Sequence, residues 1–246
     1  MKKILILGGT GEAVSLAEQF RDQLDISVIY SLAGRTRSPT LPDCEIRQGG
    51  FGGVEGLTRF LHENDIAAVI DATHPYAKQM ASNALHATTE TSLPYYKFLR
   101  PAWLEPEQAP WIRVSSADEA AEKIQGRFGR VFLSSGLNDV AAFAALTEVW
   151  FLVRSIEEPS PPISLPNFSH IKDRGPFNED GERALFLDHK IDVLVSKNSG
   201  GAATEAKLKA AYSLSIPVIM INRPKGAMES IYDNPLDLVR QLRKTL

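Results

Sequence analysis

The sequence predicts an α/β protein with mainly parallel sheets, and three features of the chain carry that prediction. Short apolar runs alternate with amphipathic segments over most of the 246 residues, which is typical of strands and helices that alternate in a parallel sheet. Many of the runs are apolar throughout, as expected where helices cover both faces of a sheet. The proline-rich stretch 100–111 interrupts the alternation. We therefore expect two domains, residues 1–104 and 105–246, with a cleft between them.

The expected strands are short runs rich in β-branched, aromatic and leucine residues. They are Ile4–Leu7, Ile26–Ser31, Ala67–Asp71, Tyr95–Leu99, Trp111–Val114, Val131–Ser134, Trp150–Arg154, Val193–Val195 and Val218–Ile221. The expected helices are segments in which apolar residues recur every three or four positions. They are Glu12–Gln23, Ala77–Thr88, Ser116–Gln125, Asn138–Leu146, Asp180–His189, Ala202–Tyr212 and Pro235–Lys244. A second proline-rich stretch, Glu157–Asn167, is expected to be a loop.

Composition narrows the class of protein. The net charge of −3 argues against a general nucleic-acid binder. Cys44 is the single cysteine, which excludes an internal disulfide and a zinc site built from cysteines, and fits a reducing cytoplasm. No apolar run reaches the length of a membrane span. We expect a cytoplasmic protein without a metal or a membrane partner, as a monomer or a weak oligomer.

A glycine turn, Gly8-Gly9-Thr10-Gly11, joins the first expected strand to the first helix. Glycines at such a turn let backbone amides approach a phosphate, and the helix N-terminus adds partial positive charge. The pattern is incomplete, because Val14 stands where a third glycine often occurs. The turn predicts a cofactor site in a Rossmann-like domain, and the alternative is a plain strand-to-helix turn.

The end of the second expected strand helps to choose the nucleotide. Sites for NAD usually place an acidic residue there, whereas basic residues suit a 2′-phosphate. Here the chain offers Ser31, Arg35, Thr36 and Arg37, and no acid. We expect NADPH, with NADH as the second choice. The alternative is that these arginines are solvated loop charges.

Two further loops leave the carboxyl ends of expected strands, where ligands bind in such folds. In the first, 47–53, Gly50 is expected to approach the cofactor with its backbone. In the second, 71–77, Thr73 is a cofactor-binding candidate, and His74 and Tyr76 are candidate catalytic acids. A single histidine in such a loop is more often structural or merely exposed.

Several motifs in fixed order carry a family resemblance. They are ILILGGTGEAVSLA (4–17), SLAGRT (31–36), GGFGG (49–53), VIDATHPYA (69–77), RPAW (100–103), RGPF (174–177), SKNSGG (196–201) and IPVIMINRP (216–224). The chain resembles the precorrin-6A reductases of cobalamin biosynthesis, including the cobalt-precorrin-6A reductases of the anaerobic route. The resemblance implies two Rossmann-like domains and an oxidoreductase acting on a CH–CH group. It implies that NAD(P)H reduces one double bond of precorrin-6A, or of its cobalt form, to give precorrin-6B.

The implied substrate is a large tetrapyrrole that bears many carboxylates. Such a ligand needs cations and amide donors spread over the second half, which has polar glycine turns before helices and arginines after strands. The candidate substrate-binding residues are Ser135, Arg154, Lys197, Asn198, Ser199 and Gly200. The alternative is that these turns only reverse the chain and that some arginines pair with nearby acids.

Glu12 follows the glycine turn, where a phosphate is expected. We include it among the cofactor-binding residues on the hypothesis that it turns away from the phosphates, toward a ribose hydroxyl or a backbone amide. The alternative is a glutamate in the first helical turn that faces solvent.

Two other functions fit the early glycine turn. A short-chain-dehydrogenase-like enzyme typically needs Tyr-x-x-x-Lys, and none of the six tyrosines has a lysine four positions later. An NADP(H)-binding sensor predicts no anion-binding turn in the second half, so the SKNSGG segment counts against it.

Overall fold

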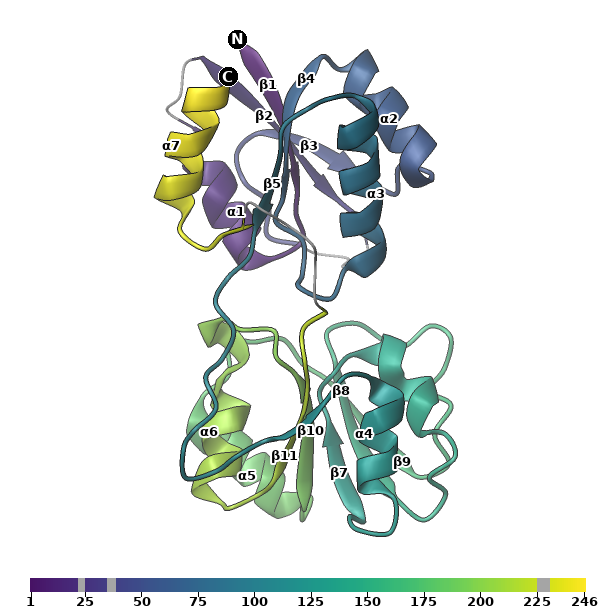
Figure 1. Ribbon diagram of the computed structural model, residues 1–246. Coiled ribbons are helices and arrows are strands. Elements are labelled where there is room, and N and C mark those ends of the chain that lie inside the picture. The colour runs from purple at the N-terminus through teal and green to yellow at the C-terminus, as the bar shows by residue number, and fades with distance from the viewer. Residues whose placement is uncertain (22–24, 35–38, 225–230) are drawn as a thin grey trace. The chain divides into compact units, whose positions relative to one another are not determined.

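A computed structural model describes residues 1–21, 25–34, 39–224 and 231–246. The chain forms two compact units, Met1–Pro101 with Lys225–Leu246, and Ala102–Pro224 (Figure 1). The first boundary therefore falls at 101/102 instead of 104/105. The expectation that the second domain runs to residue 246 is corrected, because the C-terminal segment belongs to the first unit. The cleft expected between the two domains stays a prediction.

The first unit holds a six-stranded sheet in the order β12-β5-β4-β1-β2-β3. Every strand pair in it is parallel, as predicted. The strands are β1 (Lys2–Leu7), β2 (Ile26–Leu32), β3 (Glu45–Gln48), β4 (Ile66–Asp71), β5 (Tyr95–Phe98) and β12 (Ile231–Tyr232). The helices are α1 (Gly11–Glu18), α2 (Gly53–Glu63), α3 (Lys78–Glu90) and α7 (Pro235–Thr245).

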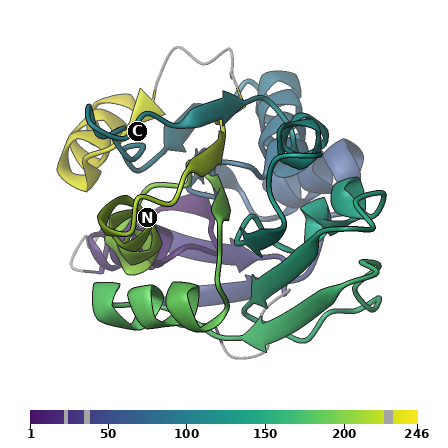
Figure 2. The same cartoon turned by 90° about the horizontal axis from the view of Figure 1, so that it is seen from below.

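Helices cover both faces of this sheet. Successive residues of a strand point to opposite faces. In β1, Ile4 and Ile6 share a core with residues of α1 and α7, whereas Leu5 and Leu7 share a core with residues of α2 and α3. Figure 1 shows α1 and α7 on one side of the sheet and α2 and α3 on the other. In Figure 2 the C-terminal helix, in yellow, lies beside strands of this unit. This layering explains why the central strands are apolar throughout.

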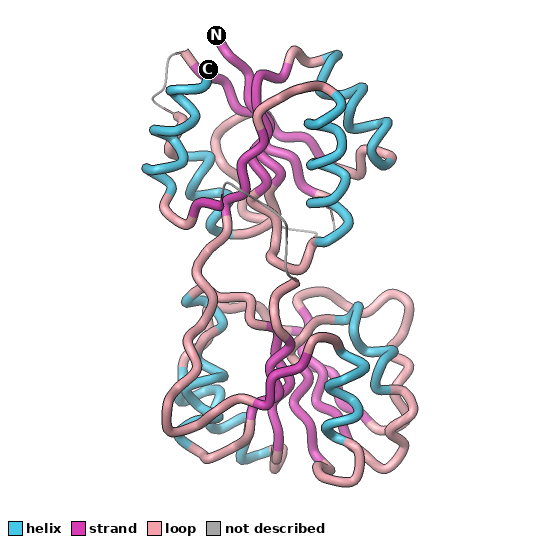
Figure 3. The backbone as a smooth tube through the Cα atoms, viewed as in Figure 1, coloured by secondary structure: helices cyan, strands magenta, loops and turns pink. Residues whose placement is uncertain are grey.

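The second unit repeats the plan with a six-stranded parallel sheet in the order β6-β11-β10-β7-β8-β9. The strands are β6 (Ile112–Val114), β7 (Arg130–Leu133), β8 (Trp150–Ser155), β9 (Phe168–Lys172), β10 (Val193–Lys197) and β11 (Val218–Ile221). The helices are α4 (Ala117–Ile124), α5 (Glu179–Asp188) and α6 (Ala206–Ser213), with 3₁₀ helices η1 (Leu137–Phe143) and η2 (Ala202–Thr204). Figure 3 shows its magenta strands between cyan helices.

The strand order places one special pair of loops in each unit. In the first unit the chain runs from β1 outward to β2 and β3, and then returns to the other side of β1 as β4. In the second unit it runs from β7 to β8 and β9, and returns beside β7 as β10. Where the order reverses, the loops after the two central strands diverge and leave a crevice at their carboxyl ends, and ligands of open α/β sheets bind there. We therefore look for sites after β1 and β4, and after β7 and β10.

The structure differs from the sequence prediction in a few elements. Segment 53–63, for which the sequence predicts no helix, is α2, which packs Val54, Leu57, Phe60 and Leu61 against one core. Its two glycines, Gly53 and Gly56, disfavour a helix, so the segment resembles a loop in the sequence. The strands β3 and β9, which lie at the sheet edges, were missed because partly exposed edge strands lack a continuous apolar run. The helix expected over 138–146 is the 3₁₀ helix η1, and the one over 202–212 is split into η2 and α6. No helix in the described part of the chain is long and apolar enough to cross a membrane.

The place of α7 in the first core gives a test of the corrected boundary. Leu242→Ala should lower the free energy of unfolding by about 2–5 kcal/mol, because Leu242 is fully buried beside strands of the first sheet. Leu236→Ala, on an exposed position of the same helix, should change it by about 0.5 kcal/mol or less. Denaturant unfolding of both variants makes the comparison, and equal effects would contradict the packing described.

Candidate functional site

The turn after β1 is fixed by a buried tyrosine. A Cβ atom on Gly8 would lie 2.1 Å from a ring carbon of Tyr30, so only glycine fits there. The Tyr30 hydroxyl accepts a hydrogen bond from the Gly9 amide at 2.9 Å. Burial raises the pKa of Tyr30, which keeps the phenol neutral. Gly9 has a φ of +105°, a conformation that side chains disfavour. Gly8 is therefore required by its contact with Tyr30, and Gly9 is favoured by its backbone conformation.

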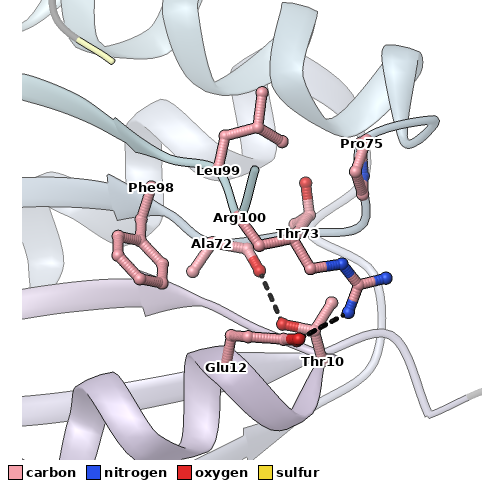
Figure 4. Close-up of a pocket in the computed structure, with 8 residues that line it drawn as sticks. All are labelled: Thr10, Glu12, Ala72, Thr73, Pro75, Phe98, Leu99 and Arg100. Carbon is pink, nitrogen blue, oxygen red and sulfur yellow. Dashed lines mark hydrogen bonds and ion pairs between the residues drawn. The ribbon is translucent and has the colours of Figure 1, made fainter. Parts of the chain in front are cut away.

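Thr10 connects this turn to the loop after β4. Its Oγ1 accepts a hydrogen bond from the Ala13 amide at 3.1 Å, which caps α1, and donates to the Ala72 carbonyl at 3.2 Å (Figure 4). The amides of Thr10, Gly11 and Glu12 have no hydrogen-bond partner among the residues that the structure describes. A Cβ on Gly11 would meet no atom within 4 Å. The turn thus leaves these amides available at the positive end of a helix, which suits an anion.

Glu12 makes an ion pair with an arginine from β5's carboxyl end. Arg100 Nη1 lies 2.8 Å from Oε1 and 2.7 Å from Oε2 of Glu12 (Figure 4). Among the described residues Glu12 therefore contacts a guanidinium and not a backbone amide, and the other half of the hypothesis, a contact with a ribose hydroxyl, stays a prediction. Arg100 begins the RPAW motif, and it is a site residue that sequence reasoning missed.

A buried polar cluster fixes the loop after β4. Asp71 Oδ2 accepts hydrogen bonds from Lys97 Nζ at 2.7 Å and from the Tyr95 hydroxyl at 2.8 Å. Asp71 Oδ1 accepts from the amide of Thr73 at 3.0 Å and from its hydroxyl at 2.6 Å. Burial, with the nearby Asp71 charge second, raises the pKa of Tyr95 far above its usual range, so Tyr95 stays a donor. The cluster places Thr73, a predicted cofactor-binding residue, on the same pocket as Thr10 and Glu12.

The two candidate catalytic acids follow in the same loop. The rings of His74 and Tyr76 lie 5.7 Å apart, and the Tyr76 amide donates to His74 Nδ1 at 3.4 Å. The residues that line the pocket include Pro75 between them but neither His74 nor Tyr76. Their catalytic role stays a prediction.

The predicted ribose region is braced by an arginine. Arg47 donates to the carbonyls of Gly49 at 2.6 Å and Gly50 at 3.0 Å, and its guanidinium lies 3.7 Å from the centre of the Phe51 ring. Its Nη1 is also 3.5 Å from the hydroxyl of Ser31, which is buried. The structure thus brings Ser31 and the Gly49–Gly50 turn together. The predicted residues 35 and 36, Arg35 and Thr36, lie outside the described residues.

In the second unit, hydrogen bonds from Trp103 and Arg223 hold the turn after β10. The Asn198 side chain accepts from the Trp103 amide at 2.8 Å and donates to its carbonyl at 3.3 Å. Arg223 donates to the carbonyls of Asn198 and Ser199 at 2.7 and 2.9 Å. The Trp103 indole donates to the Gly201 carbonyl at 3.0 Å. These contacts occupy the carbonyls and brace the predicted turn.

Carbonyls of this turn accept hydrogen bonds, whereas two of its amide groups donate none to any described residue. The amides of Gly200 and Gly201 have no partner within the described part of the chain. Lys197 Nζ lies 3.0 and 2.9 Å from the two carboxylate oxygens of Asp139 in η1, so the predicted substrate cation is already paired. Ser135, in the loop after β7, is buried, and its hydroxyl finds no hydrogen-bond partner among the described residues. The structure therefore gathers polar groups at the second point of strand reversal.

Arg154 corrects one sequence prediction. Its two terminal nitrogens donate to the carboxylate of Glu182 at 2.6 and 2.8 Å, and both side chains are buried. Its guanidinium also lies 3.8 Å from the centre of the Phe177 ring. Both terminal nitrogens of this buried arginine are engaged by Glu182, so the expectation that Arg154 binds a substrate carboxylate is corrected: its role is structural.

The fold and its loops define a class: an α/β protein with two parallel sheets, each with a glycine turn and open amides where the strand order reverses. Comparison with known proteins identifies the family within this class. The model of the family "Precorrin-6x reductase CbiJ/CobK" matches residues 3–243, and the chain belongs to that family.

Individual relatives agree. The chain is 44% identical over 225 residues to a precorrin-6A reductase of Rhodococcus erythropolis, covering 91% of this chain and 90% of the relative. It is 29% identical over 250 residues to a cobalt-precorrin-6A reductase of Priestia megaterium, covering 97% of each chain. A solved structure of "CobK precorrin-6A reductase" superposes with a TM-score of 0.92 at 37% identity, covering 100% of this chain and 97% of that one.

The Gly8–Tyr30 contact can be tested by stability. Gly8→Ala should lower the free energy of unfolding by about 1–3 kcal/mol, because the added methyl overlaps a ring that is packed in the core and cannot swing away. Gly11→Ala adds the same methyl to open space and should change stability by about 0.5 kcal/mol or less. Thermal or denaturant unfolding separates the two, and a Gly8→Ala variant as stable as Gly11→Ala would rule out the clash.

Proposed function

We propose that the protein is a precorrin-6A reductase, an oxidoreductase that uses NADPH to reduce one double bond of the macrocycle and gives precorrin-6B. The observation that carries the proposal is the family match over residues 3–243, together with relatives of that name that align over nine tenths of the chain. The reaction saturates a CH–CH unit, which needs a hydride donor, a bound macrocycle and a site closed to water.

The relatives favour the metal-free substrate. Five relatives named precorrin-6A reductase are 39–44% identical to this chain. Three relatives named cobalt-precorrin-6A reductase are 29–30% identical. We therefore propose precorrin-6A, instead of its cobalt form, as the natural substrate.

The groups after β1 and β4 fit a dinucleotide. The open amides of Thr10, Gly11 and Glu12 suit its pyrophosphate, and the absence of a side chain on Gly11 leaves room for it. Ser31, Gly50, Arg35 and Thr36 are proposed for the adenosine ribose and its 2′-phosphate. A bound reduced nicotinamide supplies a hydride. The task of Thr73 and of the Asp71 cluster that holds it is to shape the pocket and keep water out.

The groups after β7 and β10 fit substrate carboxylates. The Gly200 and Gly201 amides and the Ser135 hydroxyl are donors without partners in the described chain. Lys197 adds a cation whose partner, Asp139, keeps the local charge near neutral. A carboxylate can be held there by neutral donors as well as by charge, which suits a ligand with many such groups.

The proposal is tested by following NADPH oxidation through its near-ultraviolet absorbance. Precorrin-6A and cobalt-precorrin-6A are each offered with NADPH and with NADH, beside reactions without a macrocycle. We expect turnover with precorrin-6A and NADPH, and little oxidation without a macrocycle. Binding of NADPH with no turnover on either macrocycle would contradict the proposal and support the sensor. Faster turnover of the cobalt form would contradict the choice of substrate.

Arg35 tests the choice of nucleotide. Arg35→Ala should weaken NADPH binding about tenfold to hundredfold, because one charge-assisted contact to the 2′-phosphate is lost, and should change NADH binding little. Arg21→Ala, an exposed arginine in the first unit, is the matched control and should change neither. Titration calorimetry with both nucleotides measures the effect. Equal losses for NADPH and NADH would contradict a 2′-phosphate contact.

Lys197 tests the carboxylate site. Lys197→Met should weaken precorrin-6A binding by about tenfold to hundredfold if the contact is desolvated and by less if it is exposed, while NADPH affinity is unchanged. Added salt should weaken wild-type substrate binding more steeply than binding by the variant. Lys209→Met removes an exposed, ion-paired lysine of the same unit and serves as the control. Unchanged affinity and salt dependence in Lys197→Met would exclude this turn as the site.

A further inference from the structure

We propose that Arg100 sets the affinity of the site after β1 for a dinucleotide. It neutralises Glu12 in the pocket between the β1 and β4 loops and so decides how tightly that pocket holds an anionic dinucleotide. The inference rests on the proposed function, because it takes NADP(H) as the ligand of this pocket. It concerns a residue pair that neither the glycine turn nor the family motif assigns to a role.

The pair lies in the pocket itself. Thr10, Glu12, Thr73 and Arg100 supply its polar lining, and Phe98 contributes an apolar wall (Figure 4). Glu12 comes from α1 and Arg100 from the chain that leaves β5, 88 positions later. The contact therefore joins two elements that flank the crevice, and it places both charges where a ligand would meet them.

A carboxylate in this position opposes an anionic ligand unless it is compensated. The Glu12 and Arg100 side chains are 34% and 19% exposed, so water screens their charges only in part. Arg100 Nη1 lies within 2.8 Å of both carboxylate oxygens, so the pair carries no net charge and its field falls off faster with distance than that of Glu12 alone. Removing Arg100 leaves the negative charge of Glu12 facing the pyrophosphate, whereas neutralising Glu12 removes that repulsive charge.

A purely structural pair makes a different prediction. If the contact only clamps α1 to the end of β5, loss of either partner disturbs the same loop and weakens binding in both cases. If the pair sets the charge of the pocket, the two losses act in opposite directions, and losing both partners restores binding. The sign of the Glu12 effect therefore separates the two explanations.

The experiment measures the dissociation constants of NADP⁺ and NAD⁺ for the wild type and four variants by titration calorimetry at low and moderate salt. Arg100→Met should weaken binding about tenfold and Glu12→Gln should tighten it about threefold. The double variant should return to near the wild-type value, and Arg100→Lys should retain most of the affinity. Because both nucleotides carry the pyrophosphate, the changes should be the same for each, and salt should reduce them.

Two controls and an unfolding curve complete the design. Glu18→Gln and Arg21→Met break an ion pair at the other end of the α1 region and should leave both dissociation constants unchanged. Each variant is first shown to unfold as the wild type does. Weaker binding in both Glu12→Gln and Arg100→Met would overturn the inference and leave the proposed cofactor standing. A wild type that binds neither nucleotide would overturn the inference and NADPH use together.

Discussion

The Thr10 hydroxyl takes part in two hydrogen bonds at once: it accepts from the Ala13 amide and donates to the Ala72 carbonyl. The first bond starts α1 at a defined residue, and the second ties that start to the end of β4. Because β1 and β4 are neighbours in the sheet, the order of the strands brings the two partners within reach of one short side chain. The start of α1, and with it the position of the amides of Thr10, Gly11 and Glu12, depends on this link, whereas Thr73 is held by Asp71. A threonine at a helix start is ordinary capping chemistry. Here its second bond joins the two loops that form the pocket.

The two units have a similar arrangement of charges beside their glycine turns. Each places a carboxylate shortly after its central strand, Glu12 in the first and Asp139 in the second, and each pairs that carboxylate with a cation from another strand end, Arg100 or Lys197. Each also leaves glycine-turn amides open beside the pair. The consequence is a site that offers many donors with little net charge.

The sequence predicted the parts of this structure that depend on local pattern. Apolar runs mark the central strands because helices bury both of their faces, and the glycine turn marks the first crevice. It did not predict α2, since Gly53 and Gly56 disfavour a helix although Val54, Leu57 and Leu61 recur at helical spacing. It also failed at long-range pairs. Arg154 follows a strand as a ligand arginine would, and its partner Glu182 is 28 positions away in a helix whose place against the sheet cannot be read from spacing.

The buried cluster at Asp71 limits which charges of the pocket can respond to a ligand. Both oxygens of Asp71 are occupied, by Lys97 and Tyr95 on one side and by Thr73 on the other, and the side chain is fully buried. Removing Lys97 would leave the buried charge of Asp71 without its cationic partner, at a cost of about 3–5 kcal/mol. The cluster is therefore fixed in the folded state. Among the residues that line the pocket, Glu12 and Arg100 carry the charges, and both are partly exposed. A change of partner on ligand binding is thus far less costly for this pair than for the cluster behind it.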